Sequence, residues 1–244
     1  MNEQLSRTKL LYGVDGINRL KSSRVAVFGL GGVGGHCAEA LVRCGLGTID
    51  IIDDDIITPS NLNRQIIALH STLGQFKVEA AKKRFEDINP EIKVIIHKTF
   101  YDSKSSEQFD LSVYDYIVDA IDTIKSKVEL IVKAKIAKTP IISSMGAANK
   151  TDPSAFHVED IYKTSVCPLA KVMRHELRKN GIEALKVVYS KQNPLQKIHD
   201  DFSENKTTFS SKKRFAGSNS FVPAAAGLIL AGEVIHDLIG DCIL

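Results

Sequence analysis

The sequence predicts an α/β protein built on a doubly wound, mostly parallel sheet. Short apolar segments alternate with amphipathic segments over the first 150 residues, and a glycine-rich turn joins the first such pair. Of the 244 residues, 43% are hydrophobic, which is enough for a sizeable buried core. Alternation of this kind is typical of βαβ units, in which helices cover both faces of a parallel sheet.

The predicted strands and helices begin at residue 24 and follow one another closely. Apolar runs predict the strands, and a periodicity near 3.6 residues predicts the helices. The strands are predicted in "RVAVF", "TIDIIDDD", "KVIIHKTF", "YDYIVDAID" and "PIISS". The helices are predicted in "HCAEALVRCGLG", "QFKVEAAKKRFEDIN", "SSEQFDLS" and "KSKVELIVKAKIAK", the third of them short.

The alternation weakens after residue 150. Two further strands, "AFHVEDIY" and "ALKVVYS", and an amphipathic helix, "PLAKVMRHELRKNG", are predicted there. Residues 191–214 are polar with two short basic clusters, and they predict a mobile basic loop. "FVPAAAGLILAGEVI" predicts a helix that starts near Pro223 and packs on the sheet, because the stretch is too short and too interrupted to cross a bilayer.

Gly29, Gly31 and Gly34 form a Gly-x-Gly-x-x-Gly motif between the first strand and the first helix. Without side chains, such a turn lets phosphates approach the backbone, and the amides at a helix N-terminus favour an anion. Asp53 ends the second strand, where its carboxylate can accept both ribose hydroxyls. The motif predicts a Rossmann-like nucleotide site, with NAD or FAD as the default ligand and an empty tight turn as the structural alternative.

The segment "DDDIITPSNLNRQ", residues 53–65, argues against that default ligand. It places several polar donors directly after the ribose-side carboxylate, and the carboxyl ends of parallel strands meet at one crevice. Donors there can hold a triphosphate, and an acid can hold the magnesium ion that accompanies it. The predicted donors are Asn61, Arg64 and Lys77, and the predicted magnesium ligand is Asp122.

Each of these residues also has an ordinary structural alternative. Lys77 can be a solvated helix residue, Arg64 can cap a turn, and Asp122 can be the N-cap of the following helix. The functional interpretation depends on their combination in this order along the chain.

The cysteines argue against a structural zinc site. Cys37, Cys44, Cys167 and Cys242 form no Cys-x-x-Cys pair, so no zinc is expected. Free cysteines without such pairs fit a reducing cytosol, and a cytoplasmic protein is expected. No segment predicts a signal peptide or membrane contact.

Charge is distributed unevenly along the chain. Residues 163–214 hold 12 Lys and Arg against 5 Asp and Glu, whereas the remainder holds 20 basic against 24 acidic residues. A basic segment on a neutral-to-acidic body predicts a polyanionic partner, and a solvated basic face is the alternative.

These motifs resemble the ubiquitin-activating E1-like superfamily, which includes the adenylating enzymes of molybdopterin and thiamine synthesis. The resemblance lies in "GLGGVGG", "DDDIITPSNLNRQ", "GQFKVEAA" and "DAIDT". Three more stretches, "SRTKLLYG", "SSMGAANKTDP" and "KTSVCPLAKVMRHELRK", are similar to the tRNA threonylcarbamoyladenosine dehydratase branch. The resemblance implies one E1-like ATP-binding domain over 1–244. Its parts are an N-terminal helical segment (1–22), a nucleotide-binding core (23–150) and a substrate-side and dimer portion (151–244).

That branch activates the threonyl carboxylate of a modified adenosine in the tRNA anticodon loop. ATP forms an acyl-adenylate with release of pyrophosphate, the neighbouring carbamoyl group closes a ring, and AMP leaves, so the net change is loss of water. The resemblance implies ATP and Mg²⁺, leaves a monovalent cation open, and assigns the following ATP-site residues: Gly29, Gly31, Gly32, Gly34, Asp53, Asp55, Asn61, Arg64, Gln65, Lys77 and Asp122.

Two further residues have catalytic roles in the superfamily. Arg7 matches an arginine that reaches the triphosphate of the neighbouring subunit, which implies a homodimer. Cys167 stands where many members carry an acyl-accepting cysteine but where this branch often has an aspartate, so an ordinary loop thiol is the alternative. The residues that the basic segment would offer to tRNA are Lys171, Arg174, Arg178, Lys179, Lys212, Lys213 and Arg214.

Three other functions compete with tRNA dehydration. Activation of a ubiquitin-like sulfur carrier protein shares the adenylation step, and it would use Cys167 as the sulfur-accepting residue. An NAD-dependent oxidoreductase needs a general acid that the sequence does not place. A non-catalytic tRNA-binding module leaves the glycine motif and Asp53 without a purpose.

Overall fold

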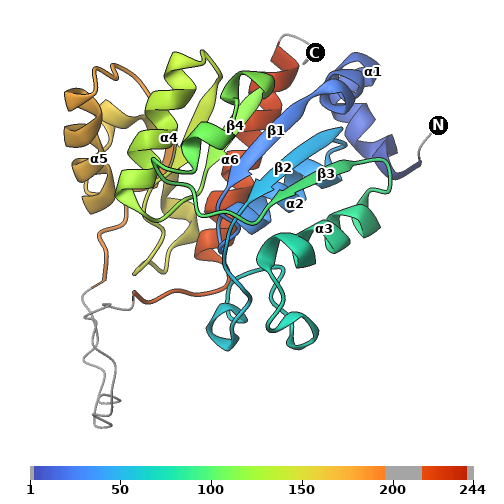
Figure 1. Ribbon diagram of the computed structural model, residues 1–244, viewed down its shortest axis with the longest axis horizontal. Helices are drawn as coiled ribbons and strands as arrows, with labels where there is room; N and C mark the ends of the chain where they lie inside the picture. Colours follow the sequence, from blue (N-terminus) through green and yellow to red (C-terminus); the bar gives the residue numbers. More distant parts are fainter. Residues whose placement is uncertain (1–2, 196–215, 241–244) are drawn as a thin grey trace.

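The computed structural model describes residues 3–195 and 216–240. Within these residues the sheet has seven strands in the order β3-β2-β1-β4-β5-β7-β6 (Figure 1). All neighbouring strands are parallel except β7 and β6. The strands are β1 (Arg24–Phe28), β2 (Thr48–Ile52), β3 (Lys93–His97), β4 (Tyr116–Asp119), β5 (Ile141–Ser144), β6 (Phe156–Asp160) and β7 (Lys186–Ser190).

This order confirms the predicted doubly wound α/β fold, because the strands spread outward from β1 in both directions. Helices lie on both faces of the sheet (Figure 1). They are α1 (Ser6–Ser22), α2 (Gly34–Arg43), α3 (Lys77–Ile88), α4 (Ile124–Ile136), α5 (Pro168–Lys179) and α6 (Val222–Ile239).

The sheet is buried on both faces, so its strands read as apolar runs rather than alternating patterns. Along β1, Val25 and Val27 join the core formed with α2, α3 and α6. Ala26 and Phe28 join the second core, formed with α4 and α5. The nucleotide-side turns therefore project from a rigid layer packed on both sides.

The helix α6 begins as Pro223 predicts, with the proline in its first turn. By length and composition α6 could cross a membrane, so the expectation that this stretch is too short was wrong. It is, however, 56% buried within the described structure, and it packs so closely on α2 that a Cβ at Gly227 would lie 2.3 Å from the Val33 carbonyl oxygen. Composition alone does not distinguish a membrane span from a core helix of this kind.

Two local predictions differ from the structure. "SSEQFDLS" forms two 3₁₀ turns, Ser106–Gln108 and Leu111–Val113, instead of one helix. Asp110 separates them, because its side chain accepts a hydrogen bond from the Ser112 N–H and starts the second turn. The N-terminal helical segment is also interrupted, since Gly13 has φ 68° inside α1.

Most of the predicted basic loop, residues 196–214, lies outside the described residues. Both described flanks of this segment are hydrogen-bonded to Asn149. The Leu195 N–H donates to the Asn149 carbonyl, and the Gly217 N–H donates to Asn149 Oδ1. Leu195 and Gly217 therefore both lie beside the loop that follows β5.

Candidate nucleotide-binding site

The glycine turn joins the carboxyl end of β1 to the start of α2, and at two of its positions it has space for glycine only. Gly29 has φ 91°, and a Cβ there would lie 2.8 Å from the Ala120 carbonyl oxygen. A Cβ at Gly34 would lie 1.8 Å from the Gly29 carbonyl oxygen. A Cβ at Gly31, in contrast, would meet nothing within 4 Å. The turn is therefore tight where it touches protein and open at Gly31, as an anion-binding turn requires.

Asp53 connects the second strand to this turn. Its Oδ2 accepts a hydrogen bond from the Leu30 N–H at 2.7 Å, and its Oδ1 accepts one from the Asp55 N–H at 3.0 Å. Lys77 Nζ lies 3.4 Å from Asp53 Oδ1 and 2.6 Å from Asp55 Oδ2. Burial raises the pKa of the Asp53 carboxyl above its usual value, although Lys77 and the two N–H groups act in the opposite direction.

Lys77 is buried, with 5% of its surface exposed, so the alternative of a solvated helix residue was wrong. It is the first residue of α3, and the loop from residue 53 folds back to it through a bridge between Ile56 and Phe76. The structure thus brings Lys77 to the carboxylates of Asp53 and Asp55.

Arg64 lies against the glycine turn. A Cβ at Gly32 would lie 3.3 Å from Arg64 Cγ. The Arg64 Nη1 group donates to the Ser60 carbonyl and to Asn63 Oδ1, both at 2.9 Å. Arg64 therefore caps its own turn, as the structural alternative states, and it also lies beside the predicted phosphate position.

Asn61 and Gln65 have different environments in this loop. Asn61 Oδ1 accepts from the Thr58 N–H at 3.0 Å and shapes the turn. Gln65 is buried, and its Oε1 has no hydrogen-bond partner within the described residues. A buried polar atom without a partner is unfavourable, so Gln65 fits a site completed by a ligand.

Asp122 follows β4 and is exposed. Its Oδ1 accepts from the Thr123 hydroxyl at 3.3 Å. The N-cap of α4 is Thr123, without a side-chain hydrogen bond, so the N-cap alternative for Asp122 was wrong. Because β4 is parallel to β1 and Ala120 touches Gly29, the chain carries Asp122 to the same edge of the sheet as the glycine turn.

Asp53, Asp54 and Asp55 bring three carboxylates within 4.8 Å of one another, close enough to hold a metal ion. Oxygen ligands of this kind suit magnesium rather than zinc. The described cysteines, Cys37, Cys44 and Cys167, are free thiols.

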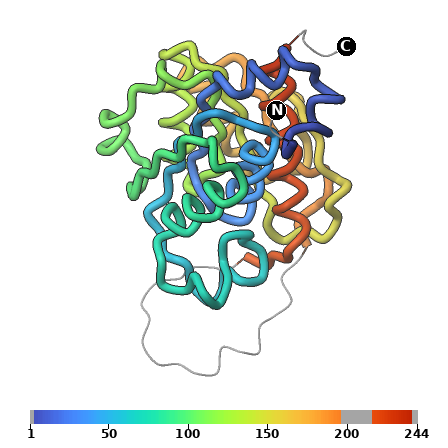
Figure 2. The backbone as a smooth tube through the Cα atoms, turned by 90° about the vertical axis from the view of Figure 1, so that its right-hand side faces the viewer, coloured from blue at the N-terminus to red at the C-terminus, as the bar shows by residue number. Residues whose placement is uncertain are grey.

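Arg7 lies at the opposite end of α2 from the glycine turn. Leu5, just before α1, packs against Gly45, which follows the last turn of α2. The ten residues of α2 separate these ends by about 15 Å. Figure 2 likewise shows α1 and the loop after β2 at opposite ends of the molecule. Within one subunit, Arg7 does not join the other predicted residues.

Cys167 is the N-cap residue of α5 and is 3% exposed. It therefore lies in the second core rather than on an open loop. Nearby Lys150 is buried and donates from Nζ to the Gln192 carbonyl. Burial lowers the pKa of the Lys150 ammonium, and Cys167 acts in the opposite direction.

The predicted tRNA-binding residues on α5 differ in exposure. Lys171, Arg178 and Lys179 are exposed, whereas Arg174 is half-buried and donates to the Thr164 carbonyl at 3.1 Å. Arg174 is thus partly occupied in holding the loop before α5. The others in the set, Lys212, Lys213 and Arg214, lie outside the described residues.

Sequence reasoning missed a buried ion pair beside the site. Lys127 Nζ lies 3.0 Å from Asp119 Oδ2, and both side chains are 0% exposed. The signal was an acid inside the apolar strand "YIVDAID", which a buried strand does not tolerate without a partner.

These features define a nucleotide-binding α/β protein. The sheet is doubly wound, a glycine turn opens the first helix after β1, and a carboxylate follows the second strand. A family match narrows this class further, because the ThiF family matches residues 2–242. The chain belongs to the ThiF family, which confirms the predicted E1-like resemblance.

The chain is 45% identical over 245 residues to a Bacillus subtilis tRNA threonylcarbamoyladenosine dehydratase, covering 99% of this chain and 96% of that protein. It is 36% identical over 176 residues to the Escherichia coli protein of the same name, covering 72% of this chain and 66% of that protein. A crystal structure of the E. coli enzyme in complex with ATP matches with a TM-score of 0.85 and 28% identity, covering 98% of this chain and 94% of the other.

Proposed function

We propose that this protein is an ATP-dependent tRNA threonylcarbamoyladenosine dehydratase. One observation carries the proposal. The glycine turn, Asp53 and the cations Arg64 and Lys77 lie together at one edge of the sheet, in a chain that is similar over its length to enzymes of that name. The reaction activates the threonyl carboxylate of the modified adenosine and closes a ring on it.

The chemistry explains why a triphosphate site is needed. A carboxylate is a poor electrophile, because its oxygen is a poor leaving group. The carboxylate oxygen attacks the α-phosphorus of ATP and pyrophosphate leaves. The tethered carbamoyl group then attacks the acyl carbon at high effective molarity, and AMP leaves with the oxygen that the substrate loses.

The residues of the site take distinct parts in this reaction. The turn at Gly31 receives phosphate oxygens, Asp53 accepts from the ribose, and Arg64 and Lys77 stabilise the negative charge that develops on the triphosphate. Arg64 and Lys77 must exchange their present partners for phosphate oxygens. Asp122, with the oxygen ligands near Asp53, would hold magnesium, which neutralises phosphate charge when bound.

A homodimer accounts for two features of α1. Leu10, Leu11 and Val14 expose 86%, 70% and 52% of their surfaces, and apolar residues gathered in this way favour burial by another chain. Arg7 lies on the same helix, remote from its own glycine turn. We propose that a partner subunit covers α1 and that Arg7 contributes to the partner's triphosphate site.

The basic segment is proposed to bind tRNA. Exposed Lys171, Arg178 and Lys179 would contact phosphates, which predicts binding that weakens with salt and depends little on sequence. We propose a cytoplasmic location without membrane contact, because tRNA is the proposed substrate.

Carrier-protein activation is the second candidate, and one observation weighs against it. An acyl- or sulfur-accepting thiol must be reached by its partner, and Cys167 is 3% exposed. The proposed ring closure needs no covalent intermediate. A Cys167→Ser variant is therefore expected to keep tRNA dehydration, whereas carrier activation through a thioester would be lost.

Pyrophosphate exchange into ATP tests the proposal directly. Exchange is expected with tRNA carrying threonylcarbamoyladenosine, together with a tRNA mass lower by one water. Exchange that occurs only with a carrier protein would instead support the second candidate. Asp122→Ala is expected to abolish exchange while the fold is kept, and Asp87→Ala, which removes an exposed acid of α3, is the matched control.

Mixing variants tests the dimer. Arg7→Ala and Asp122→Ala subunits, each inactive alone, should regain partial activity together if Arg7 acts in the partner's site. No recovery in a mixture proven to exchange subunits would contradict a contribution from Arg7 across the dimer.

A further inference from the structure

The geometry points to Asp119 and Lys127 as positioning residues that hold the backbone in front of Asp122, an inference that rests on the proposed function. Asp119 is the last residue of β4, and Lys127 lies in the first turns of α4. Between them the chain makes the short loop that carries Asp122. Both residues act through this loop and are not placed in contact with the reacting atoms.

The ion pair binds the peptide groups on both sides of Ile121. Asp119 Oδ1 accepts from the Ile121 N–H at 3.2 Å, and Lys127 Nζ donates to the Ile121 carbonyl at 3.0 Å. The Ser143 hydroxyl donates to Asp119 Oδ2 at 2.6 Å, which fixes the carboxylate from the neighbouring strand. The residue before Asp122 is thus held by charged groups at both of its polar atoms.

The same loop is confined on its other side by the glycine turn. The Ala120 N–H donates to the Phe28 carbonyl at 2.9 Å, and the Ala120 carbonyl oxygen would lie 2.8 Å from a Cβ at Gly29. Displacing residues 120 and 121 would therefore disturb the phosphate turn as well as Asp122.

Stability alone does not require a charged pair here. Burying two opposite charges carries a large desolvation penalty, and apolar or neutral residues of similar volume often give equal or greater stability. Apolar residues, in contrast, cannot bind the two peptide groups of Ile121. Lys127 neutralises Asp119, which would otherwise add an uncompensated negative charge near an anionic substrate.

The consequence for the reaction is preorganisation. A group that stabilises a transition state contributes most when its surroundings are fixed before the reaction. Misplacement by about 1 Å can reduce a rate by about 100-fold. Loosening the loop at Ile121 is therefore expected to lower kcat much more than it raises the KM for ATP.

The test separates stability from positioning with a double variant. Lys127→Met alone leaves Asp119 buried and unpaired, so a large loss of stability and activity is expected. Asp119→Asn with Lys127→Met removes both charges and is expected to restore the melting temperature close to the wild-type value. If the pair positions the loop, kcat for pyrophosphate exchange in this double variant stays about 100-fold below the wild-type value. The KM for ATP changes little.

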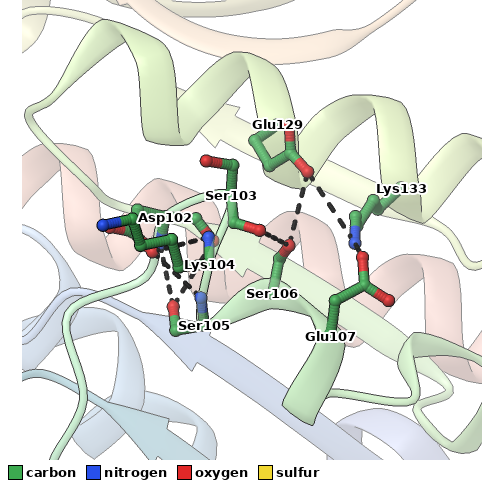
Figure 3. A network of polar contacts seen from close by, with 8 residues as sticks. All are labelled: Asp102, Ser103, Lys104, Ser105, Ser106, Glu107, Glu129 and Lys133. Carbon is green, nitrogen blue, oxygen red and sulfur yellow. Dashed lines mark hydrogen bonds and ion pairs between the residues drawn. The ribbon is translucent and has the colours of Figure 1, made fainter.

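A matched control lies on the same helix. Lys133 Nζ pairs with Glu107 at 2.5 Å and with Glu129 at 3.8 Å in an outer network (Figure 3). Lys133→Met removes a lysine ion pair from α4 without touching the loop at Ile121. It is expected to leave kcat unchanged and to lower stability only slightly.

Hydrogen exchange provides a readout that is independent of activity. Amides of residues 120–123 are expected to exchange at least about tenfold faster in the double variant than in the wild type, while β1 and β4 amides stay protected. This comparison decides the inference even if the wild type shows no pyrophosphate exchange, a result that would refute the proposed function instead. The inference is overturned if the hydrogen-exchange rates of residues 120–123 are the same in the double variant and the wild type. It is also overturned if kcat and the melting temperature of the double variant both return to the wild-type values.

Discussion

Alanine at two glycines three residues apart is expected to have opposite effects. At Gly34 a methyl group would lie 1.8 Å from the Gly29 carbonyl oxygen, which is a backbone atom that cannot turn aside. Overpacking of this kind costs about 3 kcal/mol or more. For 244 residues the unfolding entropy is about 0.5 kcal/mol/K, so Gly34→Ala should lower the melting temperature by about 6 °C.

At Gly31 the same methyl group meets no protein atom within 4 Å. The melting temperature of Gly31→Ala without nucleotide should therefore stay unchanged or rise slightly. The methyl group would occupy the space that phosphate oxygens need. ATP at about 100 times its Kd stabilises a protein by about 2.7 kcal/mol, or roughly 5 °C here. A tenfold or larger loss of affinity would reduce that shift to about half or less.

Differential scanning fluorimetry with and without Mg·ATP measures both quantities for the two variants. Gly34→Ala should unfold early in either condition, and Gly31→Ala should differ from the wild type only when nucleotide is present. Equal destabilisation of the two variants, or a full nucleotide shift for Gly31→Ala, would refute the reasoning about the open side of the turn.

Three further outcomes are expected. Lys77→Met leaves Asp53 buried without its cation and should lower the free energy of unfolding by about 3 kcal/mol in urea titrations; an unchanged value would show that the pair is not formed. Burial acts to raise the pKa of the Glu39 carboxyl, but hydrogen bonds and charge from Arg84 and Arg43 lower it below its usual value. The lowered pKa means that ionised Glu39 stabilises the folded state. This stabilisation is fully present above about pH 4.5 and is lost as the pH falls through the folded-state pKa. Glu39→Gln should therefore be less stable near neutral pH and show a flatter loss of stability in acid, whereas parallel pH curves would contradict it. Replacing Leu10 and Leu11 by serine should convert the proposed dimer to monomers in sedimentation without unfolding it, and a dimer that persists would place the interface elsewhere.

Several features of the site could be predicted because they are local. A strand, a Gly-x-Gly-x-x-Gly turn, a helix and a carboxylate at the end of the next strand lie within about thirty residues, and short-range stereochemistry largely fixes their geometry. The parallel sheet then brings Asp122 to the same edge from far along the chain, which the strand alternation also predicts. The start of α6 could be predicted from Pro223 in its first turn, because the fixed φ of proline suits that position.

Other features depend on distant contacts that no local pattern contains. Lys77 reads as an ordinary helix lysine, and only the fold of the loop from residue 53 buries it against Asp53. Cys167 reads as a loop thiol, but α5 packs it into the core. Arg7 sits near the start of the chain, and only the packing of α1 at the far end of α2 shows that it cannot serve its own glycine turn.

The sequence by itself determined the class of this protein: periodicity and glycine placement specify a doubly wound sheet with a glycine turn before the first helix of the sheet, because both act over short stretches of chain. Only the tertiary structure decided which polar groups are buried and paired. The ion pair of Asp119 and Lys127 is the clearest case, since its geometry depends on a strand, a helix and a neighbouring serine meeting in space. Burial sets the energy of a charge, and burial is a property of the whole fold.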